Sequence, residues 1–357
     1  MKQNKITNRI CLFFFVIFLF SCSGKKEDAD FLNAEIRTVE SRLYETELFI
    51  SFCKDMKVIN SHFLLSCARP NWGTLVAKES DGKEIGAVGS RGAGPGEYIT
   101  PFYSGKSING DTIYIYDFSK RVILMYEIDY SGNSFVSRYI NRIGPPSGDF
   151  IIYTDVCRLN NGYFVGLRGE DKVNAKALTL FDAQLNVVKT FGSVPLPLER
   201  DFSDFRKCFD NTRISVYNNS VFIAISNFGY IAGYDISDRG EITTRFEKIL
   251  VEPSFHIAGG IVYNSNNRSG FSDITASKNY LFAIYGGKTE DNLKPDGTGM
   301  APETFAVFNH DGKLISRIKL NNKAFRLAVS EDEERLYFCF RSPEFGFEVY
   351  KVSDLVK

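Results

Sequence analysis

The feature that most constrains the fold of this chain is a pair of turn series that run in step through it. Short turns rich in Asn, Gly, Ser and Asp, each between two apolar strand-like runs, recur about every 50 to 60 residues. In five of six units a second turn follows about 20 to 23 residues later, and in the fifth unit a gap of about 34 indicates an insertion. Such turns between alternating runs are typical of β-hairpins. The first series lies at 60–61, 109–111, 160–162, 218–219, 277–279 and 331–334, and the second at 81–82, 131–132, 182–183, 238–240, 311–312 and 353–354.

Two hairpins per unit predict one four-stranded antiparallel sheet per unit. Six such sheets around an axis form a six-bladed β-propeller, an all-β fold with short, protected edges. The aromatic content of 14% suits the half-buried faces of sheets. The last unit ends soon after its third strand, so we predict that residues 34–50 supply its fourth strand and close the ring. The predicted second strands are 62–67, 112–116, 163–167, 221–226, 280–285 and 335–340, and the third strands are 74–78, 122–128, 177–181, 230–236, 304–309 and 347–352.

The first 22 residues have the features of an export signal. Three basic residues precede the apolar stretch 10–20, which is too short to span a bilayer. Residues 19–22, Leu-Phe-Ser-Cys, resemble the lipobox of bacterial lipoprotein signal peptides. The resemblance implies cleavage before Cys22 and lipidation of that cysteine; an ordinary secretory signal with a chance cysteine is the alternative. We therefore expect a signal peptide at 1–21, a flexible tether at 22–33 and a propeller at 34–357.

A glycine-rich stretch gives the chain its family resemblance. Residues 89–96, Gly-Ser-Arg-Gly-Ala-Gly-Pro-Gly, lead into an apolar strand that ends at Asp117 and a turn at Gly132. This stretch resembles the NHL-type propeller repeat, and together with the lipobox the chain resembles the TolB-like six-bladed propeller lipoproteins. The resemblance implies a propeller exported to the outer membrane, on the cell surface or on the periplasmic face.

Charge and cysteine content exclude several kinds of partner and site. Lys+Arg and Asp+Glu both number 43, so the balanced chain has no electrostatic footprint for nucleic acid. The cysteines beyond Cys22 are scattered and form no Cys-x-x-Cys pattern, which argues against zinc or redox chemistry. If 60–61 is a hairpin turn, Cys53 and Cys67 lie nearly opposite each other and either form a disulfide or remain buried thiols.

The local motifs favour structural roles. Residues 89–96 lack the following Lys-Ser/Thr and helix of a phosphate loop, so their glycines are expected to permit positive φ and close backbone passage. Asp117 is expected to accept backbone N–H bonds at the corner that follows its strand. The histidines His62, His256 and His310 are too scattered to converge on a metal, and no Gly-x-Ser-x-Gly pattern occurs. We predict no catalytic residue, metal or cofactor, while a Ca²⁺ site built from oxygen ligands stays open.

The long predicted loops all fall on one face of the propeller. These loops, 89–100, 142–150, 193–211, 252–270 and 286–302, connect second to third strands or one blade to the next. Long loops on a rigid scaffold are where binding residues tend to lie, so we predict a binding face there. Polar residues of the innermost strands and two loop arginines could hold a polar ligand, or could pair with each other around a water-filled channel. The candidates are Arg91, Tyr103, Asp155, Arg213, Arg268, Asp273 and Arg326.

These observations predict an exported lipoprotein that acts as a non-catalytic binding or interaction module. The expected partners are the membrane, through the lipid anchor, and a protein, peptide or glycan at the long-loop face. The alternative is a propeller hydrolase or lyase that works at the mouth of the channel.

Overall fold

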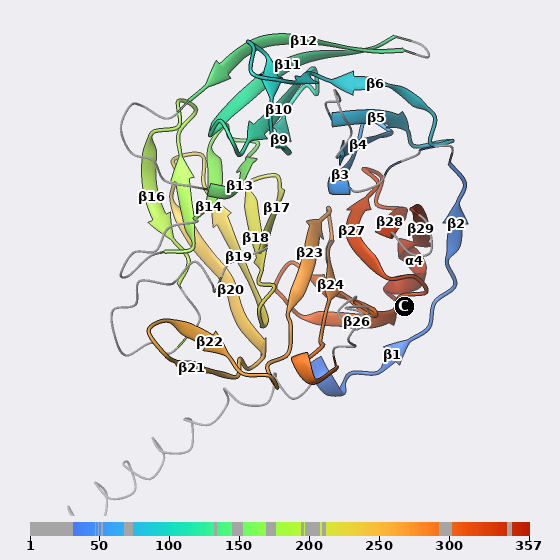
Figure 1. Ribbon diagram of the computed structural model, residues 1–357, viewed down its shortest axis with the longest axis vertical. Helices are drawn as coiled ribbons and strands as arrows, with labels where there is room; N and C mark the ends of the chain where they lie inside the picture. The colour runs from blue at the N-terminus through green and yellow to red at the C-terminus, as the bar shows by residue number, and fades with distance from the viewer. Residues whose placement is uncertain are drawn as a thin grey trace, which may run out of the picture.

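The computed structural model describes residues 31–46, 48, 50, 53–67, 74–131, 134–144, 153–168, 176–193, 196, 208, 212–292, 302–340 and 345–357. Most of its strands form six blade sheets around a common centre, and the innermost strand of each blade lies nearest to that centre (Figure 1). The prediction of an all-β, six-bladed propeller is confirmed. The predicted signal peptide and most of the tether lie outside the described residues.

The first three blades follow the chain from the innermost strand outward. Blade 1 consists of β3 (Cys53–Ile59), β4 (His62–Cys67), β5 (Thr74–Lys78) and β6 (Glu84–Val88). Blade 2 consists of β9 (Pro101–Lys106), β10 (Thr112–Asp117), β11 (Val122–Ser131) and β12 (Ser134–Ile143). Blade 3 consists of β13 (Tyr153–Arg158), β14 (Phe164–Arg168), β15 (Leu178–Phe181) and β16 (Val187–Phe191).

The remaining three blades keep the same order, except at the ring closure. Blade 4 consists of β17 (Arg213–Tyr217), β18 (Ser220–Ala224), β19 (Gly229–Ile236) and β20 (Ile242–Val251). Blade 5 consists of β23 (Phe271–Ala276), β24 (Tyr280–Tyr285), β25 (Thr304–Asn309) and β26 (Leu314–Lys319). Blade 6 consists of β27 (Ala324–Val329), β28 (Arg335–Phe340) and β29 (Gly346–Lys351), and β2 (Arg42–Tyr44) is its outermost strand.

The amino-terminal segment closes the ring as predicted. Strand β2 pairs antiparallel with β29, so the first and last parts of the chain share one sheet. The segment also makes a contact that was not predicted: β1 (Ile36–Arg37) adds a fifth, parallel strand to β26 of blade 5. Figure 1 shows this segment along the outside of the carboxy-terminal strands. It therefore binds two blades rather than one.

Local turn chemistry accounts for the hairpins. Asn60 and Ser61 have φ values of 48° and 59°, and two successive positive φ angles are what a two-residue type I′ turn needs. The resulting register places Cys53 directly opposite Cys67. The side chain of Cys67 lies outside the described residues, so both alternatives, a disulfide and two buried thiols, stay open.

The core lies between neighbouring blades, where apolar faces of adjacent sheets meet. Blades 3 and 4 share one cluster that includes Leu180, Val221 and Ile223, and blades 6 and 1 share another that includes Phe63 and Phe347. This arrangement buries both faces of each sheet except at its outer edge, and it explains the high aromatic content.

The last predicted turn is replaced by a helix. Residues 353–354 were expected to form the second turn of the sixth unit, but they lie inside the short helix α4 (Val352–Leu355). Arg37 donates hydrogen bonds to the backbone carbonyls of Asp354 (3.0 Å) and Lys357 (3.0 Å). Since the fourth strand of this blade comes from the amino-terminal segment, no local turn is needed here. No helix in the described part of the chain has the length and apolarity to cross a bilayer.

Candidate functional site

The central channel is shaped by β-bulges in the innermost strands. In five blades the pairing between the first and second strand shifts by one residue, which is an extra residue in the first strand. The strands with this bulge are β3, β9, β13, β23 and β27. In four of these strands the residue directly after the slip is charged: Asp55, Asp155, Asp273 and Arg326. Bulges re-aim side chains, and here they recur at matching positions, so that charged groups meet in one layer of the channel.

The acidic residues of this layer join neighbouring blades. Asp55 Oδ2 of blade 1 accepts a hydrogen bond from the backbone N–H of Tyr103 in blade 2 (3.1 Å). Asp273 Oδ2 of blade 5 accepts one from the backbone N–H of Leu327 in blade 6 (3.0 Å). Charge-assisted bonds of this kind are about twice as strong as neutral ones. The carboxylates therefore serve to hold adjacent innermost strands together.

Asp155 repeats this arrangement between blades 3 and 4. Its carboxyl group is hydrogen-bonded to the backbone of Ile214 in β17. Burial raises the pKa of Asp155 to about 6, and the nearby Arg213 guanidinium opposes that rise. Blades 1, 3 and 5 thus each direct an aspartate at the blade that follows.

Two arginines reach one backbone carbonyl of blade 1 at the level of these aspartates. Arg213 Nη2 of blade 4 donates to the backbone carbonyl of Lys54 in blade 1 (3.3 Å), and these two blades lie opposite each other in a six-bladed ring. Arg326 Nε of blade 6 donates to the same carbonyl (2.5 Å). Burial lowers the pKa of Arg326, and Asp273 counteracts that effect. The two guanidinium groups of Arg213 and Arg326 thus lie in one layer across the channel, which we call the arginine roof.

Lys57 lies in β3 two residues after Asp55, on the side of the two arginines that faces the short turns. Its Nζ atom lies 3.8 Å from Asp55 Oδ1, and 25% of its side chain remains accessible. Burial lowers its pKa, but the carboxylates of Asp55 and Asp273 outweigh burial, so the pKa of Lys57 is raised. The ammonium group is therefore charged at neutral pH.

A cavity of about 350 Å³ lies beneath the roof and opens between the turns that join first to second strands. It exists because the other five blades present small side chains at the level of Lys57, which are Gly105, Cys157, Ser215, Thr275 and Ala328. This opening lies on the short-turn face, opposite to the long-loop face.

Glycine is required at position 105. A Cβ atom there would lie 2.7 Å from the Cβ of Arg158 on the neighbouring blade, and φ of Gly105 is 155°. The close approach of β9 and β13 therefore depends on the missing side chain.

Side chains of the short turns bind one another around the mouth of this cavity. Glu331 accepts a hydrogen bond from the backbone N–H of Asn60 (2.9 Å) and forms an ion pair with Lys106. Asn160 Nδ2 donates to Asn218 Oδ1 of the next blade (3.1 Å). These contacts hold the rim of the mouth in a defined shape.

The structure brings five of the seven predicted site residues together in the channel and leaves two outside it. Arg91 is exposed in β7 (Ser90–Arg91), a short strand of the 89–100 loop. Arg268 is exposed as well, and its Nη1 atom donates to the carbonyl of Gly287 (3.1 Å). The five channel residues are Tyr103, Asp155, Arg213, Asp273 and Arg326. Their role in ligand binding stays a prediction.

Sequence reasoning missed Asp55 and Lys57. Both lie next to apolar residues in β3, whose sequence is Cys-Lys-Asp-Met-Lys-Val-Ile. Polar residues in an innermost strand were the available signal, and the same criterion had identified Asp155 and Asp273.

On the long-loop face, the best described feature is the hairpin of β21 (Phe255–Ile257) and β22 (Ile261–Tyr263). Ile261 is buried, and the ring of Tyr263 lies 6.5 Å from that of Phe228 in blade 4. Ile257 and Val262 remain 44% and 37% exposed. The hairpin is thus anchored on one side and displays apolar side chains on the other. The predicted loops 142–150, 193–211 and 286–302 lie partly or largely outside the described residues.

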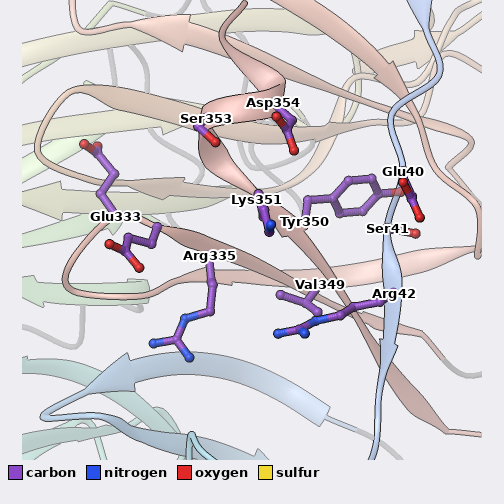
Figure 2. Close-up of a pocket in the computed structure, with 11 residues that line it drawn as sticks. Glu40, Ser41, Arg42, Glu333, Arg335, Val349, Tyr350, Lys351, Ser353 and Asp354 are labelled. Atoms are coloured by element: carbon purple, nitrogen blue, oxygen red, sulfur yellow. The ribbon is translucent and has the colours of Figure 1, made fainter.

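A second pocket, of about 870 Å³, lies where the ring closes (Figure 2). It is framed by the start of β2, the turn at 333–335 and helix α4, at the place where the other blades have a turn. Glu333 in its wall already accepts hydrogen bonds from Asn279, and Asp354 is paired with Lys357. Charges of both signs are mixed over an open surface, which selects no ligand class.

The structure supports the structural reading of the Asp117 motif. Asp117 is fully buried and accepts hydrogen bonds from the backbone N–H groups of Ile99 (2.9 Å), Thr100 (3.0 Å) and Ser119 (3.0 Å). It therefore fixes the glycine-rich loop to the corner of its own blade. Gly89 in that loop has φ of 61° and lies against the ring of Tyr126, as the predicted close passage requires.

The described part of the chain contains no group of three or more His, Cys, Asp or Glu side chains placed to hold a metal ion. Two histidines are engaged elsewhere: His62 stacks on Tyr130, with ring centroids 4.4 Å apart, and His310 lies 3.0 Å from the carbonyl of Ser277. The question of an oxygen-ligated Ca²⁺ site stays open.

Comparison with known proteins agrees with this geometry. The family model described as TolB-like 6-blade propeller-like matches residues 80–332. A candidate exported protein from Bacteroides fragilis NCTC 9343 has a similar structure, with a TM-score of 0.58 at 14% identity over 86% of this chain and 87% of the other. Hydrazine synthase from Kuenenia stuttgartiensis gives a TM-score of 0.46 at 11% identity over 85% of this chain and 78% of that one. At 14% identity the first of these structures shows a shared fold alone. A search of curated proteins found no match.

Proposed function

Because this chain belongs to the TolB-like six-bladed propeller family, we propose that it is a non-catalytic binding module, exported and held at the outer membrane by a lipid on Cys22. Its partner is a protein, peptide or glycan that meets the long-loop face. The observation that carries this proposal is the β21–β22 hairpin, which is fixed to blade 4 and turns apolar side chains outward.

The hairpin has the properties of a preformed contact surface. Asn267, which follows it, donates to the carbonyl of Asn227 in blade 4 (2.8 Å), and Ser254, which precedes it, receives a bond from Asn264 (2.9 Å). The two ends of the hairpin are therefore bonded to each other, and one of them to blade 4, so little conformational entropy is lost when a partner binds. Exposed aliphatic groups on such a rigid element favour contact with another macromolecule.

The channel charges favour binding over catalysis. A hydrolase or lyase needs carboxylates that can approach a substrate. Here Asp55 and Asp273 are engaged with backbone N–H groups of the next blade, and Arg213 and Arg326 both donate to the Lys54 carbonyl. The enzyme alternative is accordingly the weaker one.

Photo-crosslinking on intact cells tests this proposal. A photoreactive amino acid in place of Ala258, beside Ile257, should form a covalent adduct of defined mass. The double variant Ile257→Asp with Val262→Asp, carrying the photoreactive group at Ala258, should reduce that adduct about tenfold or more, because two charges replace buried apolar area at the contact.

Ile108 provides the matched control. It is 79% exposed but lies in a short turn on the opposite face. The variant Ile108→Asp should leave the adduct at position 258 unchanged. Equal adduct yields from the hairpin variant and the wild type, or adducts formed only from position 108, would rule out the long-loop face as the binding surface.

A further inference from the structure

We propose that the cavity on the short-turn face is a second binding site, and that it takes a small anion carrying a carboxylate or phosphate group. The site lies at the opposite end of the channel from the hairpin, and it does not depend on the function proposed above.

The charged residues that line this cavity are mostly cationic. One of them, Glu331, is acidic, and the other four are basic: Lys57, Lys106, Arg158 and Lys278. Glu331 already forms an ion pair with Lys106 and accepts a hydrogen bond from the backbone N–H of Asn60. The lining therefore carries an excess of positive charge, although the whole chain has a net charge of zero.

Lys57 supplies an ammonium group inside the cavity. Its Nζ atom lies 3.8 Å from Asp55 Oδ1, which is longer than a hydrogen bond, and the structure gives it no closer acceptor among the described residues. The channel aspartates do not line the cavity. Asp55 is engaged with the backbone N–H of Tyr103, and Asp273 with that of Leu327. The N–H donors of Lys57 are therefore available to a ligand.

Two more of the lining cations lack a carboxylate partner. Arg158 Nη1 donates to the carbonyl of Lys106 (3.0 Å), and its guanidinium lies 4.7 Å from the centre of the Tyr114 ring. Lys278 is exposed in the turn between β23 and β24. Neither side chain forms an ion pair with any residue in the described part of the chain. Cations gathered at one opening attract anions to it.

The size and polarity of the cavity suit a small oxyanion. Its volume of about 350 Å³ is at the lower end of the range of roughly 300 to 1,000 Å³ for small-ligand sites. The Ser215 hydroxyl in its wall accepts from the backbone N–H of Ala276 (2.9 Å) and keeps its own proton to donate. Ammonium and hydroxyl donors match the oxygen atoms of a carboxylate or phosphate, whereas a cation would meet the excess positive charge.

Ligand-detected NMR and calorimetry on the full chain test the proposal, at low ionic strength where charges are least screened. D-glucuronate and D-glucose 6-phosphate serve as anionic probes, and D-glucose is the neutral control of similar shape. At least one anionic probe should bind saturably and about tenfold or more tightly than D-glucose. The variant Lys57→Met should weaken that binding about tenfold or more, because a hydrogen bond from a charged group is lost at nearly constant volume.

Two further variants make the result decisive. Lys278→Glu changes an exposed residue, which covers the case that Lys57→Met fails to fold, and the reversed charge at the mouth should weaken binding about threefold or more. Lys189→Glu makes the same change in charge on the exposed outer strand β16 and should bind like the wild type. Binding of D-glucose as tight as that of the anionic probes, no binding of either anion, or equal affinities of Lys278→Glu and Lys189→Glu would overturn the proposal.

Discussion

Asp155 shows how burial in the channel changes the ionisation of a single residue. Its carboxyl group helps to join two blades, yet burial raises its pKa to about 6 from an ordinary value of 3.8. The folded protein therefore holds this proton more tightly than the unfolded chain does. As pH rises from about 4 through about 6, stability must fall, because the folded state has to accommodate a buried charge.

The variant Asp155→Asn should remove this pH dependence. An amide keeps an acceptor for the Ile214 N–H but never ionises, so above pH 6 the variant should be the more stable protein, by at most about 3 kcal/mol for two pKa units. Urea unfolding between pH 4 and 8 measures this. Asp129→Asn, at an exposed position of β11, is the control and should follow the wild type; a variant that tracks the wild type at every pH would show that Asp155 is not the titrating group.

At the scale of elements, the amino-terminal segment binds both blade 5 and blade 6. Phe31 is 2% exposed, and its ring packs against Phe271 and Tyr285. The guanidinium of Arg317 lies 4.8 Å from the centre of that ring and donates to the Phe31 carbonyl (2.8 Å). Phe31 therefore attaches the amino-terminal segment to blade 5 before β1 and β2 begin. This attachment explains how such short strands keep their positions.

The variant Phe31→Ala should destabilise the propeller by about 3 kcal/mol, as for other large-to-small changes at buried aromatic residues. Leu43 belongs to the same segment but is 66% exposed, so Leu43→Ala should cost less than about 0.5 kcal/mol. Hydrogen exchange of β26 and β29 should rise in the first variant only. Similar unfolding midpoints for the two variants would mean that ring closure does not depend on the Phe31 contact.

At the scale of the whole molecule, the position of Phe31 limits where the propeller can lie. Residues 22–30 separate the proposed lipid on Cys22 from this fixed point, and nine extended residues span at most roughly 30 Å. A lipid on Cys22 would therefore keep the propeller close to the membrane surface, with blade 5 nearest to the point of attachment.

Cys22→Ser tests the anchor directly. In a bacterial host the wild type should incorporate a labelled fatty acid and sediment with membranes, whereas the variant should do neither, because it lacks the thiol that would carry the lipid. Cys53→Ser, a change at a buried position in β3, controls for loss of any cysteine. Membrane association of Cys22→Ser equal to that of the wild type would exclude the lipid anchor.

Local chemistry in the sequence determined the blades of this protein. The positive-φ turn at Asn60 and Ser61, the alternation within each strand and the acceptor role of Asp117 all depend on neighbours within about 20 residues, so strand bounds and blade number could be predicted. Polar residues in the predicted innermost strands identified five channel residues, although their contacts could not be predicted.

The tertiary structure alone decided which side chains meet in the channel and where its cavity opens. Arg213 and Arg326 meet the Lys54 carbonyl across 159 and 272 positions of sequence, and Lys57 borders a cavity only because five other blades present small residues at its level. Such contacts arise when six separate sheets are brought around one axis. No local pattern encodes them, because each depends on the simultaneous position of blades that are distant in the chain.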